Sequence, residues 1–182
     1  MRILILIDIE GGTKTQKNIA EEAMRFYIKK LMPRKRSLII DLKIRNLLKD
    51  DLAGLCERVD KNYFILETHH RGNLYEFLSY LAHEVIHLKQ YATGELMTSG
   101  KKELWNGEDH TDTPYRKQPW EVEAWSNQHA LAKDYIKNGL GLTLKATKEL
   151  NPRSMKKMDW AAESKFLINL VDKQEARKCK KK

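Results

Sequence analysis

The chain has 182 residues, 41% of them hydrophobic, and a formal net charge of +9 at pH 7. This length suits a single domain with a hydrophobic core. Its longest early apolar run, residues 3–7, is far too short to cross a membrane or to act as a secretory signal. Only Cys56 and Cys179 are present, which excludes a disulfide framework and favours a reducing, cytoplasmic location.

The first 70 residues contain the signals of one strand, one helix and then three more strands. An apolar, β-branched run over 2–9 predicts a buried strand that a Gly-Gly pair closes. Helical spacing of apolar residues follows over 15–32 and stops at a proline. Three further strands are predicted over 37–45, 54–60 and 62–68. We expect these three strands to form a meander.

The segment that follows the first predicted strand resembles a phosphate site only in part. Asp8 and Glu10 stand where acidic pairs hold magnesium in phosphoryl-transfer enzymes. Thr13, however, occupies the place of the second glycine of a phosphate loop, and the first glycine is also missing. Aspartate, glutamate and glycine are common turn residues at strand ends, so an ordinary turn is the favoured interpretation.

The second half of the chain is predicted to be mainly helical. One helix begins after the N-cap residue Asn73 and ends at Gly94, with apolar residues at spacings of three and four. Residues 95–118 contain several glycines and prolines and predict an irregular or hairpin-bearing segment. Two more helices are predicted, over 120–137 and over 154–177.

The helix that follows Asn73 carries His83, Glu84 and His87, an H-E-x-x-H motif. Four helical residues turn through about 400°, so both imidazoles project from the same side, one turn apart. Both can then reach one zinc ion, while the glutamate acts as general base toward a metal-activated water. The motif is short, and a chance match of two polar histidines on an amphipathic helix is the competing interpretation.

A zinc site needs a third protein ligand, and the residues just after His87 do not supply it. Gln90 and Thr93 stand where a metzincin would have glycine and histidine. The segment PWEVEAW, residues 119–125, offers Glu121 and Glu123 at the start of the next helix. Two residues turn through about 200°, so only one of these carboxylates can face the metal, and spacing alone leaves both open.

The remaining candidates are weaker. His110 is a rival third ligand, and His110 and Tyr115 are both candidates for stabilising a developing oxyanion. His69 and His70 are expected in a loop near the cleft, and His129 is expected to be structural or exposed.

The motif HEVIH followed by a helix with E-x-x-A resembles zinc metallopeptidases of the gluzincin type. This resemblance implies that the third ligand is Glu121, three positions before Ala124. Residues 60–130 as a whole are similar to small metallopeptidases encoded by bacteriophages, distantly akin to the ImmA/IrrE and SprT-like groups. Many gluzincins have Asp or Asn after the alanine to support a ligand histidine. This chain has Trp125, so that support must come from elsewhere, with Glu123 as a candidate.

These observations together predict an α+β fold with a small, mostly antiparallel sheet packed on the H-E-x-x-H helix. We expect a zincin-like domain over 1–150 and a C-terminal helix with a basic tail over 151–182, packed on the same domain. The expected cofactor is Zn²⁺ and the expected partner is a peptide or protein substrate in the cytoplasm, of a host cell if the chain is phage-encoded. The strand over 62–68 is our candidate for the edge along which an extended peptide lies.

Two other classes of function stay open. The chain can be a non-proteolytic binding module whose zinc is structural. It can also bind nucleic acid through basic clusters at 29–36 and 173–182, although a solvated surface and tail is the favoured interpretation of such charge. The sequence does not indicate an oligomeric state.

Overall fold

The structure is a computed structural model that describes residues 4–47, 53–69 and 74–140. The expected C-terminal helix and basic tail lie outside the described residues, as do the predicted N-cap Asn73, His70 and Cys179. The elements in chain order are β1 (Leu4–Gly11), α1 (Lys14–Leu31), β2 (Ser37–Arg45), β3 (Gly54–Asp60), β4 (Tyr63–His69), α2 (Leu74–Thr93), β5 (Leu96–Ser99), β6 (Lys102–Trp105), β7 (Glu108–Asp109), a 3-10 turn η2 (Tyr115–Lys117) and α3 (Pro119–Asn138).

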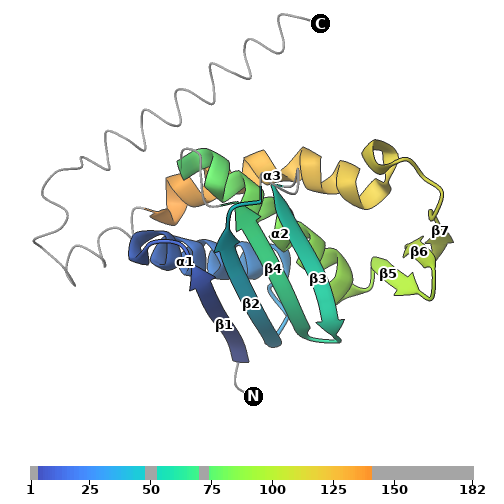
Figure 1. Ribbon diagram of the computed structural model, residues 1–182, viewed down its shortest axis with the longest axis horizontal. Helices are drawn as coiled ribbons and strands as arrows, with labels where there is room; N and C mark the ends of the chain where they lie inside the picture. Colours follow the sequence, from blue (N-terminus) through green and yellow to red (C-terminus); the bar gives the residue numbers. More distant parts are fainter. Residues whose placement is uncertain (1–3, 48–52, 70–73, 141–182) are drawn as a thin grey trace, which may run out of the picture.

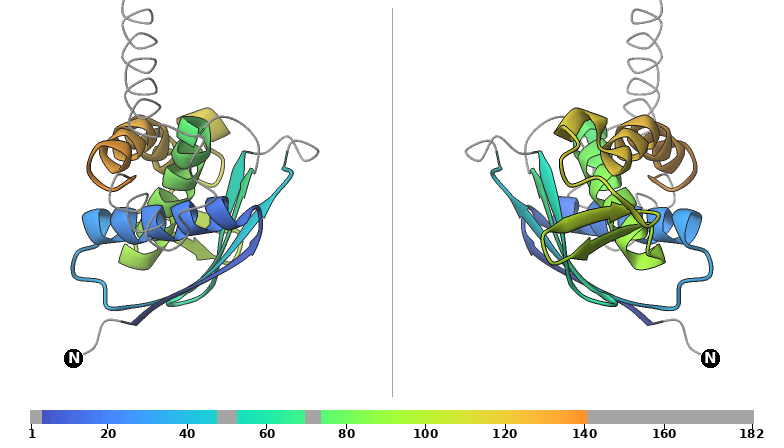
Figure 2. Two further views of the ribbon diagram at one scale, coloured as in Figure 1. Left: turned by 90° about the vertical axis from the view of Figure 1, so that its left-hand side faces the viewer. Right: turned by 90° about the vertical axis from the view of Figure 1, so that its right-hand side faces the viewer.

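The main sheet has four strands in the order β1-β2-β4-β3. Helices α1 and α2 pack on one of its faces, and α3 packs mainly on α2 (Figures 1 and 2). The inward residues of β2 alternate with outward ones, so that Leu38, Ile40, Leu42 and Ile44 are all buried under the helices. The opposite face carries polar pairs, including the Tyr63 hydroxyl 2.5 Å from Asp41 Oδ2. The fold is therefore α+β, with the helices on one side of the sheet.

The sheet corrects two of our predictions. It is mostly parallel, because β1 pairs with β2 and β2 pairs with β4 in parallel, while only β3 is antiparallel to its neighbour. The expected meander is also wrong, because β4 lies between β2 and β3. The sequence is consistent with this order, because β3 carries the charged residues Glu57, Arg58 and Asp60, which suit an edge strand. The edge beside α2 is therefore β3, and the strand over 62–68 is internal.

Helix α1 begins with a capping box that accounts for the Gly-Gly-Thr-Lys-Thr segment. The Thr13 hydroxyl accepts a hydrogen bond from the Gln16 backbone N–H, and the Gln16 side chain accepts one from the Thr13 N–H. Asp8 and Glu10 are exposed on β1. Local structure thus explains the segment without a bound phosphate or magnesium.

Helix α2 lies between the sheet and α3 and is the element on which the candidate site is built. It packs against α1, α3, β3 and β4, and most of its residues from Phe77 to Gln90 are buried, polar ones included. Residues 95–118 form a second small sheet, β5-β6-β7, beyond the end of α2 (Figure 1). None of the helices in the described part of the chain is long and apolar enough to span a bilayer.

Candidate metal centre

Two histidines of α2 project side by side from one helical row. His83 and His87 are one turn apart, and each is only 8% exposed. Their ring centroids are 4.7 Å apart and their Nε2 atoms are separated by 3.0 Å. The predicted convergence of the two imidazoles is therefore present in the structure.

Glu121 closes the cluster from the first turn of α3. Its side chain is buried, with one carboxylate oxygen 3.4 Å from His83 Nε2 and the other 3.3 Å from His87 Nε2. Pro119 starts the helix at a position where proline is favoured, which sets Glu121 at the end that faces α2. One ligand atom from each of the three side chains lies within 4.8 Å of the others, so the group could hold a metal ion.

The donor atoms fit a small tetrahedral cation. Ligands held at ~2.0–2.1 Å around a tetrahedral ion are separated by about 3.3–3.4 Å. Here the two Nε2 atoms are 3.0 Å apart, and each lies 3.3–3.4 Å from a different oxygen of the Glu121 carboxylate. Glu121 Oε2 is buried, and although His83 Nε2 lies 3.4 Å away, no hydrogen bond to this oxygen is formed among the described residues. A buried carboxylate oxygen of this kind is costly unless a positive charge faces it.

The hydrogen bonds around His87 fix its tautomer. The Gln90 amide nitrogen donates to the Trp120 carbonyl at 2.9 Å and to Glu123 Oε2 at 2.8 Å, and both of these partners only accept. The amide oxygen of Gln90 must then face His87 Nδ1, which lies 2.8 Å away. An amide oxygen cannot donate, so Nδ1 of His87 carries a proton, and in the neutral imidazole the lone pair of Nε2 points into the cluster.

His83 has a matching partner on α3. Its Nδ1 lies 2.8 Å from Gln128 Oε1, and Gln128 is 3% exposed. The Gln128 amide nitrogen is in turn 3.3 Å from His129 Nε2, whose Nδ1 is 2.8 Å from the Tyr75 hydroxyl. The buried Gln128 amide, itself in contact with His129, thus orients this imidazole, as expected around metal-ligating histidines.

Glu123 is not a member of the metal cluster. Its carboxylate accepts hydrogen bonds from Lys89 and Gln90, so it supports His87 indirectly, through Gln90. Of the two carboxylates that spacing left open, the structure brings Glu121 to the histidines.

The Glu121 carboxylate and the His87 imidazole influence each other's pKa. Burial raises the pKa of Glu121, but the adjacent imidazoles of His83 and His87, the positive charge of a protonated His87 and the Tyr115 hydroxyl lower it overall to about 2. Burial lowers the pKa of His87, yet its hydrogen bonds and the neighbouring carboxylates raise it on balance. When no metal is bound, a proton on His87 supplies the positive charge that the carboxylate requires.

Glu84 lies next to the cluster and is 4% exposed. Burial raises its pKa to about 7, against the lowering influence of His87 and His83. A carboxylate with a pKa close to neutrality can both accept and return a proton.

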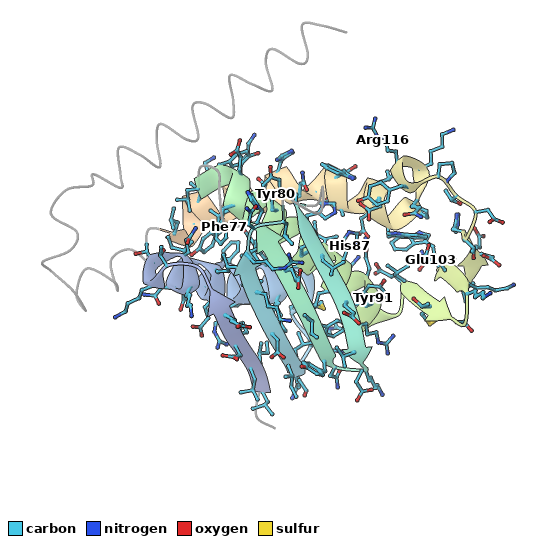
Figure 3. The ribbon with its side chains drawn as sticks, in the orientation of Figure 1. Phe77, Tyr80, His87, Tyr91, Glu103 and Arg116 are labelled. Atoms are coloured by element: carbon cyan, nitrogen blue, oxygen red, sulfur yellow. The ribbon has the colours of Figure 1, made fainter. Side chains whose placement is uncertain are left out.

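A cavity of about 190 Å³ opens onto these groups. The β3 residues Gly54, Leu55 and Cys56 form one wall, and the others come from α2, β5, η2 and α3. Figure 3 shows His87 and Tyr91 beyond the free edge of β3, on the side of the β5-β7 sheet. The histidine–carboxylate cluster and Glu84 thus face an edge strand rather than the interior of the sheet.

Tyr115 lines this cavity, whereas His110 does not. The Tyr115 hydroxyl donates to the Glu121 carboxylate, and its side chain is 57% exposed at the cavity mouth. His110 Nδ1 instead lies 3.3 Å from the Thr113 hydroxyl, and its ring packs edge-on against Trp120. Among the described residues, His110 is therefore brought neither to the metal cluster nor to the cavity.

Two other histidines have structural positions. His69 is not in a loop as expected: it is the last residue of β4, is buried, and lies with Nδ1 3.2 Å from the Leu47 backbone N–H. The His129 ring stacks on Tyr75, in agreement with its expected structural role.

The roles of Gln90 and Gln128 were missed in the sequence. Gln90 is three residues after His87, and Gln128 is seven residues, or two turns, after Glu121. Each position therefore shares a helix face with a ligand, and this spacing is the signal that identifies both residues.

No family of known proteins matches this chain, and neither curated proteins nor solved structures include a match to it.

Proposed function

We propose that this protein is a zinc-dependent metallopeptidase whose general base is Glu84. The observation that carries the proposal is the convergence of His83, His87 and Glu121 beside a buried carboxylate that shares their cavity. Two neutral nitrogens and one carboxylate are the donor set that a catalytic zinc site uses, with a fourth position left for water or substrate. The gluzincin resemblance of the motif points to the same class of enzyme.

When bound, a zinc ion supplies positive charge that makes a water molecule more acidic and attracts a carbonyl oxygen. Glu84 accepts the proton of that water as the oxygen attacks the peptide carbonyl carbon. Glu84 then gives this proton to the leaving amine. Tyr115 at the cavity mouth donates its hydroxyl hydrogen to the negative oxygen of the substrate.

The substrate that fits this site best is an extended peptide laid along β3. The free edge of this strand borders the catalytic cavity and continues into a groove of about 660 Å³, which shares Leu55, Cys56 and Tyr91 with it. Unpaired main-chain groups on an edge strand can align a peptide bond without requiring particular side chains. Replacing single backbone N–H groups of a cleaved peptide with ester oxygens tests this, and unchanged cleavage of every ester analogue would refute the alignment.

The test of the proposed function combines metal analysis with hydrolysis. Zinc should be stoichiometric in the purified protein and in Glu84→Gln, but lost in His83→Ala and Glu121→Ala. Glu123→Ala is the matched control on the same helical turn and should keep at least part of the zinc. An internally quenched library of random peptides should be cleaved by the zinc-loaded protein and not by Glu84→Gln.

Two results would redirect the interpretation. Stoichiometric zinc with no cleavage of any peptide would favour a binding module with a structural metal. Full zinc in Glu121→Ala, together with loss in Glu123→Ala, would show that the ligand assignment is wrong. A cytoplasmic location is part of the proposal, because the zinc chemistry needs no oxidising compartment and the described Cys56 is unpaired.

Binding of nucleic acid has less support from the described basic residues. In the cluster at 29–36, Lys30 forms an ion pair with Asp134, and Lys35 donates to the Ala92 carbonyl at 3.2 Å. These contacts occupy two of its cationic side chains within the fold.

A further inference from the structure

Gly54, the first residue of β3, lies directly against the side chain of Glu84. A Cβ atom built on Gly54 would be 2.2 Å from Glu84 Oε1, 2.6 Å from Cδ and 2.7 Å from Cγ. Non-bonded carbon atoms are comfortable at about 3.5–4.0 Å. Any residue other than glycine at this position would therefore overlap the catalytic carboxylate itself.

Rotating the Glu84 carboxylate group cannot relieve this overlap, because Cγ is also too close. The overlap is removed only if Glu84 adopts a different side-chain rotamer or if β3 moves away from Glu84. The strand is held on its other side, since Gly54 pairs with Thr68 of β4 and the Ala53 carbonyl accepts from the His69 N–H at 3.0 Å. A side chain at position 54 would consequently displace Glu84 rather than the strand.

We propose that Gly54 is a positioning residue: the missing side chain at the start of the edge strand gives the Glu84 carboxylate its place beside the metal centre. Glycine inside a strand often marks such a close approach. Gly54 lies in the wall of the cavity and is not one of the three metal ligands, so it acts on the base and leaves metal binding intact. This inference rests on the proposed function only for the chemical role of Glu84.

A double-mutant cycle in thermal stability tests the contact without any substrate. In the wild-type background, Gly54→Ala should lower the melting temperature because the methyl group overlaps Glu84. In the Glu84→Ala background the same substitution should leave the melting temperature unchanged or raise it. The methyl group then enters space that the carboxylate has left, and alanine also restricts the unfolded chain more than glycine does.

Gly139→Ala is a matched control for a generic clash. A Cβ at Gly139 would be 2.3 Å from Tyr135 Cδ2, a similar overlap at the far end of α3. This substitution should lower the melting temperature equally with and without Glu84→Ala. Equal effects of Gly54→Ala in the two backgrounds would overturn the proposal.

Hydrolysis gives the functional readout. With zinc content unchanged, Gly54→Ala should reduce kcat/KM on the quenched peptide library by roughly 10²-fold, the cost of a ~1 Å misplacement of a catalytic group. Gly139→Ala should retain activity at a temperature where it is folded. Unreduced kcat/KM in folded, zinc-loaded Gly54→Ala would refute the positioning role. If the wild-type protein cleaves nothing, the proposed function fails, while the stability cycle still decides whether Gly54 positions Glu84.

Discussion

Removing the hydrogen-bond acceptor behind His83 should weaken metal binding without touching a ligand. The perturbation is Gln128→Met, which keeps an unbranched side chain of similar length but has no amide oxygen. In the wild-type protein that oxygen lies 2.8 Å from His83 Nδ1, and both groups are buried. The substitution leaves a buried N–H without a partner and releases the imidazole from the tautomer that presents Nε2 to the metal.

The size of the effect follows from the cost of that unpaired donor. An unsatisfied buried hydrogen-bonding group costs about 1–3 kcal/mol, and about 1.4 kcal/mol corresponds to a tenfold change in a binding constant. We therefore expect zinc affinity to fall roughly 10- to 100-fold, the range typical for residues that support a metal ligand.

The assay is competition for zinc with a chromophoric chelator, at a pH where the histidines are neutral. Gln128→Glu restores an acceptor at the same place and should recover most of the affinity. Asn127→Ala is the control, because the Asn127 amide donates to the Glu123 backbone carbonyl at the surface and, within the described ranges, does not contact a metal ligand. Equal zinc affinities for Gln128→Met and the wild-type protein would show that Gln128 does not orient His83.

Three further results are expected. Tyr115→Phe should keep its zinc and lose roughly 10²–10³-fold in kcat, the effect of removing an oxyanion donor, and an unchanged kcat would remove the tyrosine from the mechanism. Zinc affinity should decrease as the pH falls, by about tenfold per pH unit for each proton that competes with the metal. Because the pKa of His87 is raised, this decrease should begin above pH 6.5. A zinc affinity that stays constant down to pH 5.5 would contradict this expectation. Thr13→Ala should lower the free energy of unfolding by about 1 kcal/mol through loss of the α1 cap, with zinc content unaffected, whereas any loss of zinc would reveal a link between this cap and the site.

The local elements were predictable because their signals lie within a few residues. The predicted strands over 37–45 and 54–60 match β2 and β3, and the capping and breaking residues set α1, α2 and α3 to within about two residues. The order of the strands was not predictable in the same way, since it depends on which strands pair with a neighbour along both of their edges. The charged residues of β3 are visible in the sequence. They identify β3 as an edge strand only when it is also known that β2 pairs with β4.

The candidate site, too, has features that the local sequence predicts and features that depend on tertiary packing. The spacing of His83 and His87 predicts their convergence, because helix geometry alone determines it. The choice of Glu121 over Glu123 depends on how α3 is rotated against α2, which only tertiary packing determines. The contact between Gly54 and Glu84 joins residues 30 positions apart and has no local signal at all.

The ligands come from two helices that the β5-β7 sheet separates along the chain. A cation bound to them would act as a cross-link between His87 and Glu121, and the closed loop would contain the 33 residues from 88 to 120. Cross-links of this kind stabilise a fold by removing freedom from the unfolded chain, and a bound ion adds stability that grows with its free concentration. The amount of available zinc should therefore set how firmly α3 and the small sheet stay docked, and a strong chelator should loosen that half of the protein before the half built on α1 and β1.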